Sequence, residues 1–164
     1  MTGPVALSAA RFPNTAATDF LLEVGEPVST DGKNIRAAAL AYGTPLEEYP
    51  GQKLGSVAYG YPPFINWICL QGSAAAIALV AYVNISLWHE ACAILTPALR
   101  KHPGVPEEVM AYFAAYEERP TDILDKALAI VADETKAGHS VQQASDTGRL
   151  MEKHLAAFWQ PAAQ

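Results

Sequence analysis

Residues 67–90 read WICLQGSAAAIALVAYVNISLWHE, within a stretch from Phe64 to Trp88 that carries no charged side chain. A membrane-spanning helix needs about 20 predominantly apolar residues, so this stretch is long enough to span a bilayer. However, no Lys or Arg lies within about ten residues of either end to set an orientation. The stretch also contains the polar side chains of Asn66, Gln71, Ser73 and Asn84. We therefore expect the central helix of a bundle, covered by other helices, and no membrane contact.

Three amphipathic segments follow this central helix. The first opens at Val105-Pro106-Glu107-Glu108, with proline near the first turn and two carboxylates at the positive end of the helix dipole. The second begins near Thr121 and is expected to end at Gly138. The third begins at Ser140, which has Gln143 three residues later in a capping-box pattern. No alternating strand pattern competes, so the sequence predicts an all-α fold.

Prolines and glycines interrupt the first 60 residues at short intervals. Only short elements fit between such breakers, so we expect an irregular N-terminal arm with brief helices over residues 14–24 and 34–42. A chain of 164 residues is long enough for one hydrophobic core. The sequence therefore predicts a single domain over residues 1–164, in which 1–60 form the arm and 61–164 the helical bundle.

The composition limits the partners and the compartment. The formal net charge of -6 disfavours nucleic acid and anionic membranes, which are bound through clusters of Lys and Arg. The first residues lack the basic segment and apolar run of a signal peptide, so we expect a cytoplasmic protein. Cys69 and Cys92 both lie among apolar residues and are expected to be reduced, buried thiols.

Several motifs in the second half resemble those of the heme-oxygenase-like helical families. These are Val105-Pro106-Glu107-Glu108, the Tyr112-Phe113 pair that follows it, and the closing segment from Gly148 to Trp159. The families include the thiaminase-type TenA proteins, the cofactorless oxidase that completes pyrroloquinoline quinone, and the diiron oxidases. The resemblance covers roughly residues 64–160 and implies a heme-oxygenase-like helical bundle.

The metal-binding motif of those families is absent. Where the metal-dependent members carry His, Asp and His after the Phe-Phe turn, this chain has Tyr116, Pro120 and Ile123, and the glutamate of the central helix falls near Ser86. Proline and isoleucine have no donor atom, so we expect neither a metal nor another cofactor. An atypical metal site of an oxidase remains an alternative. It would use His89, Glu90, Asp122 and Asp125. The spacing of these residues matches no diagnostic metal-binding motif.

Acid–base chemistry needs no metal. A carboxylate in an apolar cavity has a raised pKa and can carry a proton near neutral pH. The candidate catalytic residues are Glu90, His89, Glu117 and Asp122. The candidate substrate-binding residues, which suit a flat aromatic molecule, are Tyr82, Ser86, Trp88, Tyr112, Tyr116 and Trp67. The alternative for each is structural: aromatic residues at helical spacing usually pack in a core, and charged residues at helix ends usually face solvent.

Two functional hypotheses follow. The first is a metal-independent enzyme of specialised metabolism that performs an acid–base condensation or cyclisation on a small aromatic substrate, for example a Pictet–Spengler-type reaction. The second is a non-catalytic small-molecule-binding or partner subunit of the same fold. A cavity with a carboxylate in it would favour the enzyme, whereas a solidly packed bundle would favour the second. The arm carries apolar side chains that need cover, so we expect it either to cap the mouth of the bundle or to exchange with a second subunit in a homodimer.

Overall fold

The computed structural model describes residues 2–45 and 60–160, which contain α-helices and no β-strand. The all-α prediction is therefore confirmed. The helices are α1 (Thr2–Ala9), α2 (Ala16–Ala41), α4 (Tyr61–Gln71), α5 (Ala74–Lys101), α6 (Glu107–Ala114), α7 (Thr121–Lys136) and α8 (Val141–Trp159).

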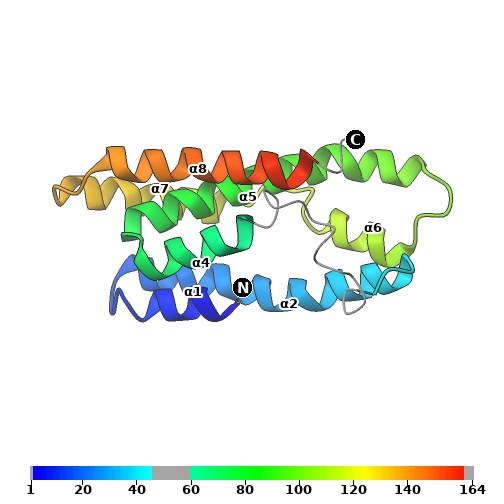
Figure 1. Ribbon diagram of the computed structural model, residues 1–164, viewed down its shortest axis with the longest axis horizontal. Coiled ribbons are helices and arrows are strands. Elements are labelled where there is room, and N and C mark those ends of the chain that lie inside the picture. The colour runs from blue at the N-terminus through cyan, green and yellow to red at the C-terminus, as the bar shows by residue number, and fades with distance from the viewer. Residues whose placement is uncertain (1, 46–59, 161–164) are drawn as a thin grey trace.

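The helices form an elongated bundle (Figure 1). Helix α5 is central: it packs against α7 and α8 along its length and against α6 towards its C-terminal end. Helix α2 runs along the opposite side of the molecule, where it contacts α1, α6 and α7. The short helix α4 lies between α1 and α8. The result is two layers of helices, bridged at one end by α6 (Figure 1).

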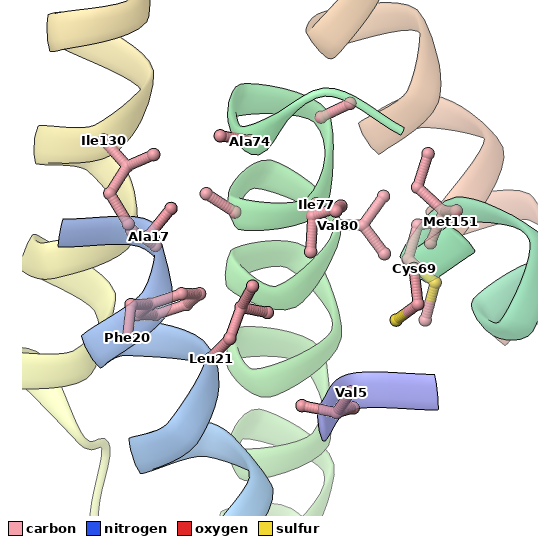
Figure 2. Close-up of a cluster of buried hydrophobic side chains, with 14 of the residues drawn as sticks. Val5, Ala17, Phe20, Leu21, Cys69, Ala74, Ile77, Val80, Ile130 and Met151 are labelled. Carbon is pink, nitrogen blue, oxygen red and sulfur yellow. The ribbon is translucent and has the colours of Figure 1, made fainter. Parts of the chain in front are cut away.

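The hydrophobic core surrounds the N-terminal half of α5 (Figure 2). Ile77 and Val80 of α5 are buried there beside Met151 of α8 and Cys69 of α4. Helix α2 supplies Phe20 and Leu21, and helix α7 supplies Ile130, to the same cluster. Alanines at the start of α5 let these neighbours approach its backbone closely. The apolar run is thus a core element as far as Val80, whereas most side chains of α5 beyond that point are half-buried or exposed.

The run is not one helix, however. Helix α4 ends at Gln71 and α5 begins at Ala74. Between them Gly72 is extended (φ −68°, ψ 156°), and Ser73 caps α5 because its Oγ accepts a hydrogen bond from the Ala76 N–H at 3.2 Å. A Cβ at Gly72 would lie 2.6 Å from the Ile68 carbonyl oxygen, so only glycine fits this sharp turn.

The N-terminal segment holds the turn between α4 and α5, which we call the corner, in place. The Ser8 hydroxyl donates to the Cys69 carbonyl at 2.6 Å. The Arg11 guanidinium donates to the carbonyls of Cys69 and Gly72, both at 2.8 Å. The last carbonyls of a helix have no partner within the helix, so these bonds satisfy groups that would otherwise need water.

The prediction of an irregular N-terminal arm is wrong over the described residues. In place of short helices at 14–24 and 34–42, one continuous helix, α2, runs from Ala16 to Ala41 with Pro27 inside it. Proline removes one backbone hydrogen bond from a helix interior, but tertiary packing can offset that loss. Here Phe20 and Leu21 are buried in the core, and Lys126 of α7 pairs with Glu23 at 2.7 Å. Residues 46–59 of the predicted arm lie outside the described residues.

The boundaries of the last two helices are confirmed. Helix α7 begins at Thr121, and Gly138, two residues after its last residue, has a positive φ of 90°. The Ser140 Oγ accepts a hydrogen bond from the Gln143 N–H at 3.4 Å at the start of α8. Both signals are local in sequence, which explains why they could be predicted.

Among the described residues, α5 alone is long and apolar enough to cross a membrane. Core helices of globular proteins meet the same two conditions, so this is weak evidence for location. Both the absence of membrane contact and a cytoplasmic location stay predictions.

Replacing Gly72 by alanine should destabilise the fold by more than about 2 kcal/mol, because the new methyl group would overlap the Ile68 carbonyl and side chain. Gly32→Ala is the matched control. Gly32 lies within α2 with open space where a Cβ would stand, so that change should stabilise the protein by about 0.5–1 kcal/mol. Urea unfolding of both variants measures the change in the free energy of unfolding. Equal effects would contradict the claim that only glycine fits the turn between α4 and α5.

Candidate functional site

The predicted site residues fall in three places. Most lie on α5 between Tyr82 and Glu90, or on α6 and the α6–α7 connection that pack against α5. Asp122 lies exposed in the first turn of α7, where its charge suits the helix dipole, and Asp125 is also exposed. Trp67 lies on α4, is 54% exposed, and stacks on Phe64 at a ring distance of 6.3 Å. The structure therefore does not gather the predicted residues into one pocket.

Aromatic rings fill the space between α5, α6 and the end of α8. Trp88 stands 5.7 Å from Trp159 and from Tyr116, and 6.1 Å from Tyr112 and from Phe113, measured between ring centroids. We call these five residues the Trp88 cluster. Edge-to-face and offset contacts at such distances are typical of packed aromatic cores. Trp88, Tyr112 and Tyr116, which were predicted to bind substrate, contact one another in this cluster.

The two tyrosines of the cluster stay protonated. Burial raises the pKa of Tyr112 to about 12, and the nearby Asp31 charge acts in the same direction. Burial also raises the pKa of Tyr116 well above its ordinary value, helped by a hydrogen bond with Asp31 of α2. The cluster thus reaches across to α2 through a phenol–carboxylate contact, and it offers no readily ionised phenol.

His89 packs against this cluster, with its ring 5.5 Å from the Tyr116 ring in an edge-on arrangement. Burial holds the pKa of His89 below its ordinary value; the carbonyls of Glu118 and Tyr116 oppose this shift, and the Arg119 charge adds to it. The ring is therefore neutral at pH 7. Its Nδ1 is buried and has no hydrogen-bond partner.

Arg119 binds three side chains of α5. Its guanidinium donates to Glu90 at 3.0 Å and to the Ser86 Oγ at 3.2 Å, and it lies 3.5 Å from the Tyr82 hydroxyl. Because these positions are four residues apart, they form one polar stripe along the helix. We call this group the Arg119 cluster. It fastens the α6–α7 connection to α5.

The carboxylates predicted as proton carriers sit in ion pairs. Glu90 is 59% exposed and pairs with Arg119, and both oxygens of Glu117 accept hydrogen bonds from Arg100, one of them at 2.9 Å. An exposed pair of this kind contributes about 0–1 kcal/mol to stability.

Both thiols are free and buried, as predicted. Burial raises the pKa of each, that of Cys92 to about 11, with the Glu117 charge adding to the shift. The reactive species of cysteine is the thiolate, so neither thiol suits nucleophilic catalysis.

A groove that the sequence analysis missed lies between α5 and the end of α8. Its volume is about 370 Å³, and it is open to solvent. Its lining is Leu87, Ala91, Glu152, Leu155, Ala156 and Trp159. The recurrence of apolar side chains at 87, 91, 94 and 98 was a signal for an exposed apolar seam on α5.

The described residues, 2–45 and 60–160, bring no three His, Cys, Asp or Glu side chains close enough together to hold a metal ion. His89, Glu90, Asp122 and Asp125, the alternative metal set, therefore do not form such a group.

The fold and these contacts define an all-α helical-bundle protein with a packed aromatic cluster. No family model, no curated protein and no solved structure matches the chain. The resemblance to heme-oxygenase-like families thus stays a prediction.

Trp88→Ala should lower the free energy of unfolding by about 3–5 kcal/mol, because it removes the ring on which the aromatic cluster packs. Trp67→Ala, the matched control on the exposed face of α4, should cost less than about 1 kcal/mol. Thermal and urea unfolding report both values. A small effect at Trp88 would mean that its ring lines a cavity instead of packing within the Trp88 cluster.

Proposed function

We propose that this chain is a non-catalytic helical-bundle subunit that acts by binding a protein partner. One observation carries the proposal: three of the four candidate proton carriers are engaged by neighbouring side chains, while the fourth, Asp122, lies exposed at the start of α7. Glu90 is paired with Arg119, Glu117 is paired with Arg100, and His89 is packed against Tyr116. None of them lines the groove between α5 and α8.

General acid–base catalysis needs a group within hydrogen-bond reach of the substrate and with a pKa near the working pH. Glu90 and Glu117 are each held in an ion pair with an arginine instead. Burial holds the pKa of His89 below its ordinary value, and its Nδ1 is buried. These contacts favour a structural role for each of the three residues.

The proposal includes membership of the heme-oxygenase-like fold as a divergent, ligand-free form. Two of the positions that would hold metal ligands in that family are occupied by other interactions here. Tyr116 belongs to the Trp88 cluster, and Ser86 accepts a hydrogen bond from Arg119. These contacts support a bundle in which the positions of the family's metal ligands are occupied by aromatic packing and by a hydrogen bond from the Arg119 guanidinium.

The metal-independent condensation or cyclisation of an aromatic substrate stays a prediction, as does an oxidase with an atypical metal site. No contact among the described residues favours either over the binding role.

The proposal is tested by incubating the purified protein with a metabolite extract of its source cells and following the extract by mass spectrometry. Heat-denatured protein and Glu90→Gln are the controls. We expect the extract to stay the same in all three samples over hours. Time-dependent loss of a metabolite with the native protein, absent with the denatured one, would overturn the non-catalytic role. Retention of that loss in Glu90→Gln would then remove Glu90 from the mechanism.

A further inference from the structure

We infer that His89 is a pH-sensitive switch: protonation of its imidazole ring releases the connection between α6 and α7, residues 115–120, from helix α5. The inference goes beyond the proposed function and does not rest on it, because it concerns how the bundle opens and not what the bundle binds. Three features of the described residues carry it: the place of the ring, the charge beside it, and the contacts that hold the connection.

The His89 ring lies where the connection packs on α5. It is half-buried and stands edge-on to the Tyr116 ring, with 5.5 Å between the ring centroids. The carbonyls of Tyr116 and Glu118 lie close to the ring, but Nδ1 is buried and has no hydrogen-bond partner among the described residues. A neutral ring can keep Nδ1 as a bare acceptor. In an imidazolium the same atom is a buried, unpaired donor on a charged group, which is far more costly.

The charged side chain that acts on the ring is a cation. Arg119 belongs to the connection itself, and its charge disfavours a second positive charge on His89. The neighbouring carboxylates are held by arginines: Glu90 accepts a hydrogen bond from Arg119, and both oxygens of Glu117 accept hydrogen bonds from Arg100. Neither carboxylate is paired with the imidazole, so a protonated His89 gains no counter-charge from them.

The titratable groups on the other packed elements supply no counter-charge either. Helix α2 contributes Asp31, which is hydrogen-bonded with the Tyr116 phenol. Helix α6 contributes Tyr112, whose pKa burial raises to about 12, and α5 itself contributes Cys92, whose pKa burial raises to about 11. Both therefore stay neutral where a histidine titrates.

The sign of the pH dependence follows from these surroundings. Burial is the main cause of the lowered pKa of His89 in the closed bundle. In an opened or unfolded chain the ring has its ordinary pKa of about 6.5. The open state therefore binds the proton more readily than the closed state does. The closed state is fully favoured above about pH 6.5 and loses stability as the pH falls towards the lowered pKa, so acid opens the contact.

The other polar contacts of the connection lie near the surface. Arg119 donates to Glu90 at 3.0 Å and to Ser86 at 3.2 Å, and its pair with Glu90 is exposed. Exposed pairs contribute little to stability, and a positive charge on His89 weakens this one further by repelling the guanidinium. The Tyr116 ring, 5.7 Å from the Trp88 ring, moves with the connection. Opening thus uncovers part of the Trp88 cluster.

Hydrogen–deuterium exchange of the full chain between about pH 5.5 and 7.5, read by mass spectrometry, tests the proposal. Protection factors correct for the intrinsic pH dependence of amide exchange. The protection of residues 107–120 should fall below about pH 6.5 by up to about tenfold per pH unit, which is the limit for one linked proton. The protection of residues 16–26, which belong to the α2 segment in the core, should stay constant. Constant protection of residues 107–120 overturns the proposal.

Two variants assign the effect to one histidine. His89→Phe keeps a ring against Tyr116 and cannot take up a proton, so the protection of residues 107–120 should no longer depend on pH. His102→Gln, at the exposed C-terminal cap of the same helix, is the matched control and should behave as the wild type does. A pH dependence that persists in His89→Phe contradicts the switch.

A titration of the wild-type protein keeps the test decisive if His89→Phe fails to fold. The ring signals of His89, followed by NMR, should give a pKa below the ordinary value of about 6.5. A pKa at or above that value overturns the proposal. Turnover of a metabolite would end the non-catalytic role and leave the switch standing.

Discussion

The Arg11 guanidinium fixes the corner on which the bundle depends. It donates hydrogen bonds to the carbonyls of Cys69 and Gly72, while the Ser8 hydroxyl donates to Cys69 as well. These carbonyls end α4, and a buried helix end without partners is costly. The N-terminal segment therefore serves as the cap of a helix about 60 residues away in the chain. Without it, the turn at Gly72 would expose unpaired polar groups beside the core.

The corner decides what each half of the apolar run does. Helix α4 turns back to pack against α1 and α8, so Ile68 and Cys69 enter the core from one side. Helix α5 starts again at Ala74 and runs through the centre, where its alanines leave room for α7 and α8. Its C-terminal half then extends beyond the core. The Trp88 and Arg119 clusters fasten the middle of α5, from Tyr82 to Glu90, to α6 and the α6–α7 connection.

The sequence predicts best what depends on near neighbours in the chain. The cap at Ser140, the stop at Gly138 and the apolar spacing of α7 are local signals, and each agrees with the structure. The turn at Gly72 was missed because glycine is tolerated inside helices. The close contact between Gly72 and Ile68, which leaves no room for a Cβ, is not visible in the sequence. The continuous helix through Pro27 was missed because its stabilising contacts come from distant segments.

The candidate site was less predictable for the same reason. The sequence identified Trp88, Tyr112 and Tyr116 as an aromatic group, but spacing alone does not distinguish a cavity wall from a packed core. It also could not show that Arg119 would reach across 29 residues to Glu90. The catalytic hypothesis for Glu90 therefore depended on a contact that the sequence does not show.

The role of Arg11 is tested most directly by urea unfolding of Arg11→Met, which keeps much of the side-chain volume and removes the donors. Arg149→Met is the control, because Arg149 is an exposed arginine that contacts Asp146 at 3.5 Å within α8. Losing two charge-assisted bonds to buried carbonyls should lower the free energy of unfolding by about 2 kcal/mol, against less than about 0.5 kcal/mol for the control. Equal stabilities of the two variants would contradict the claim that Arg11 holds the corner.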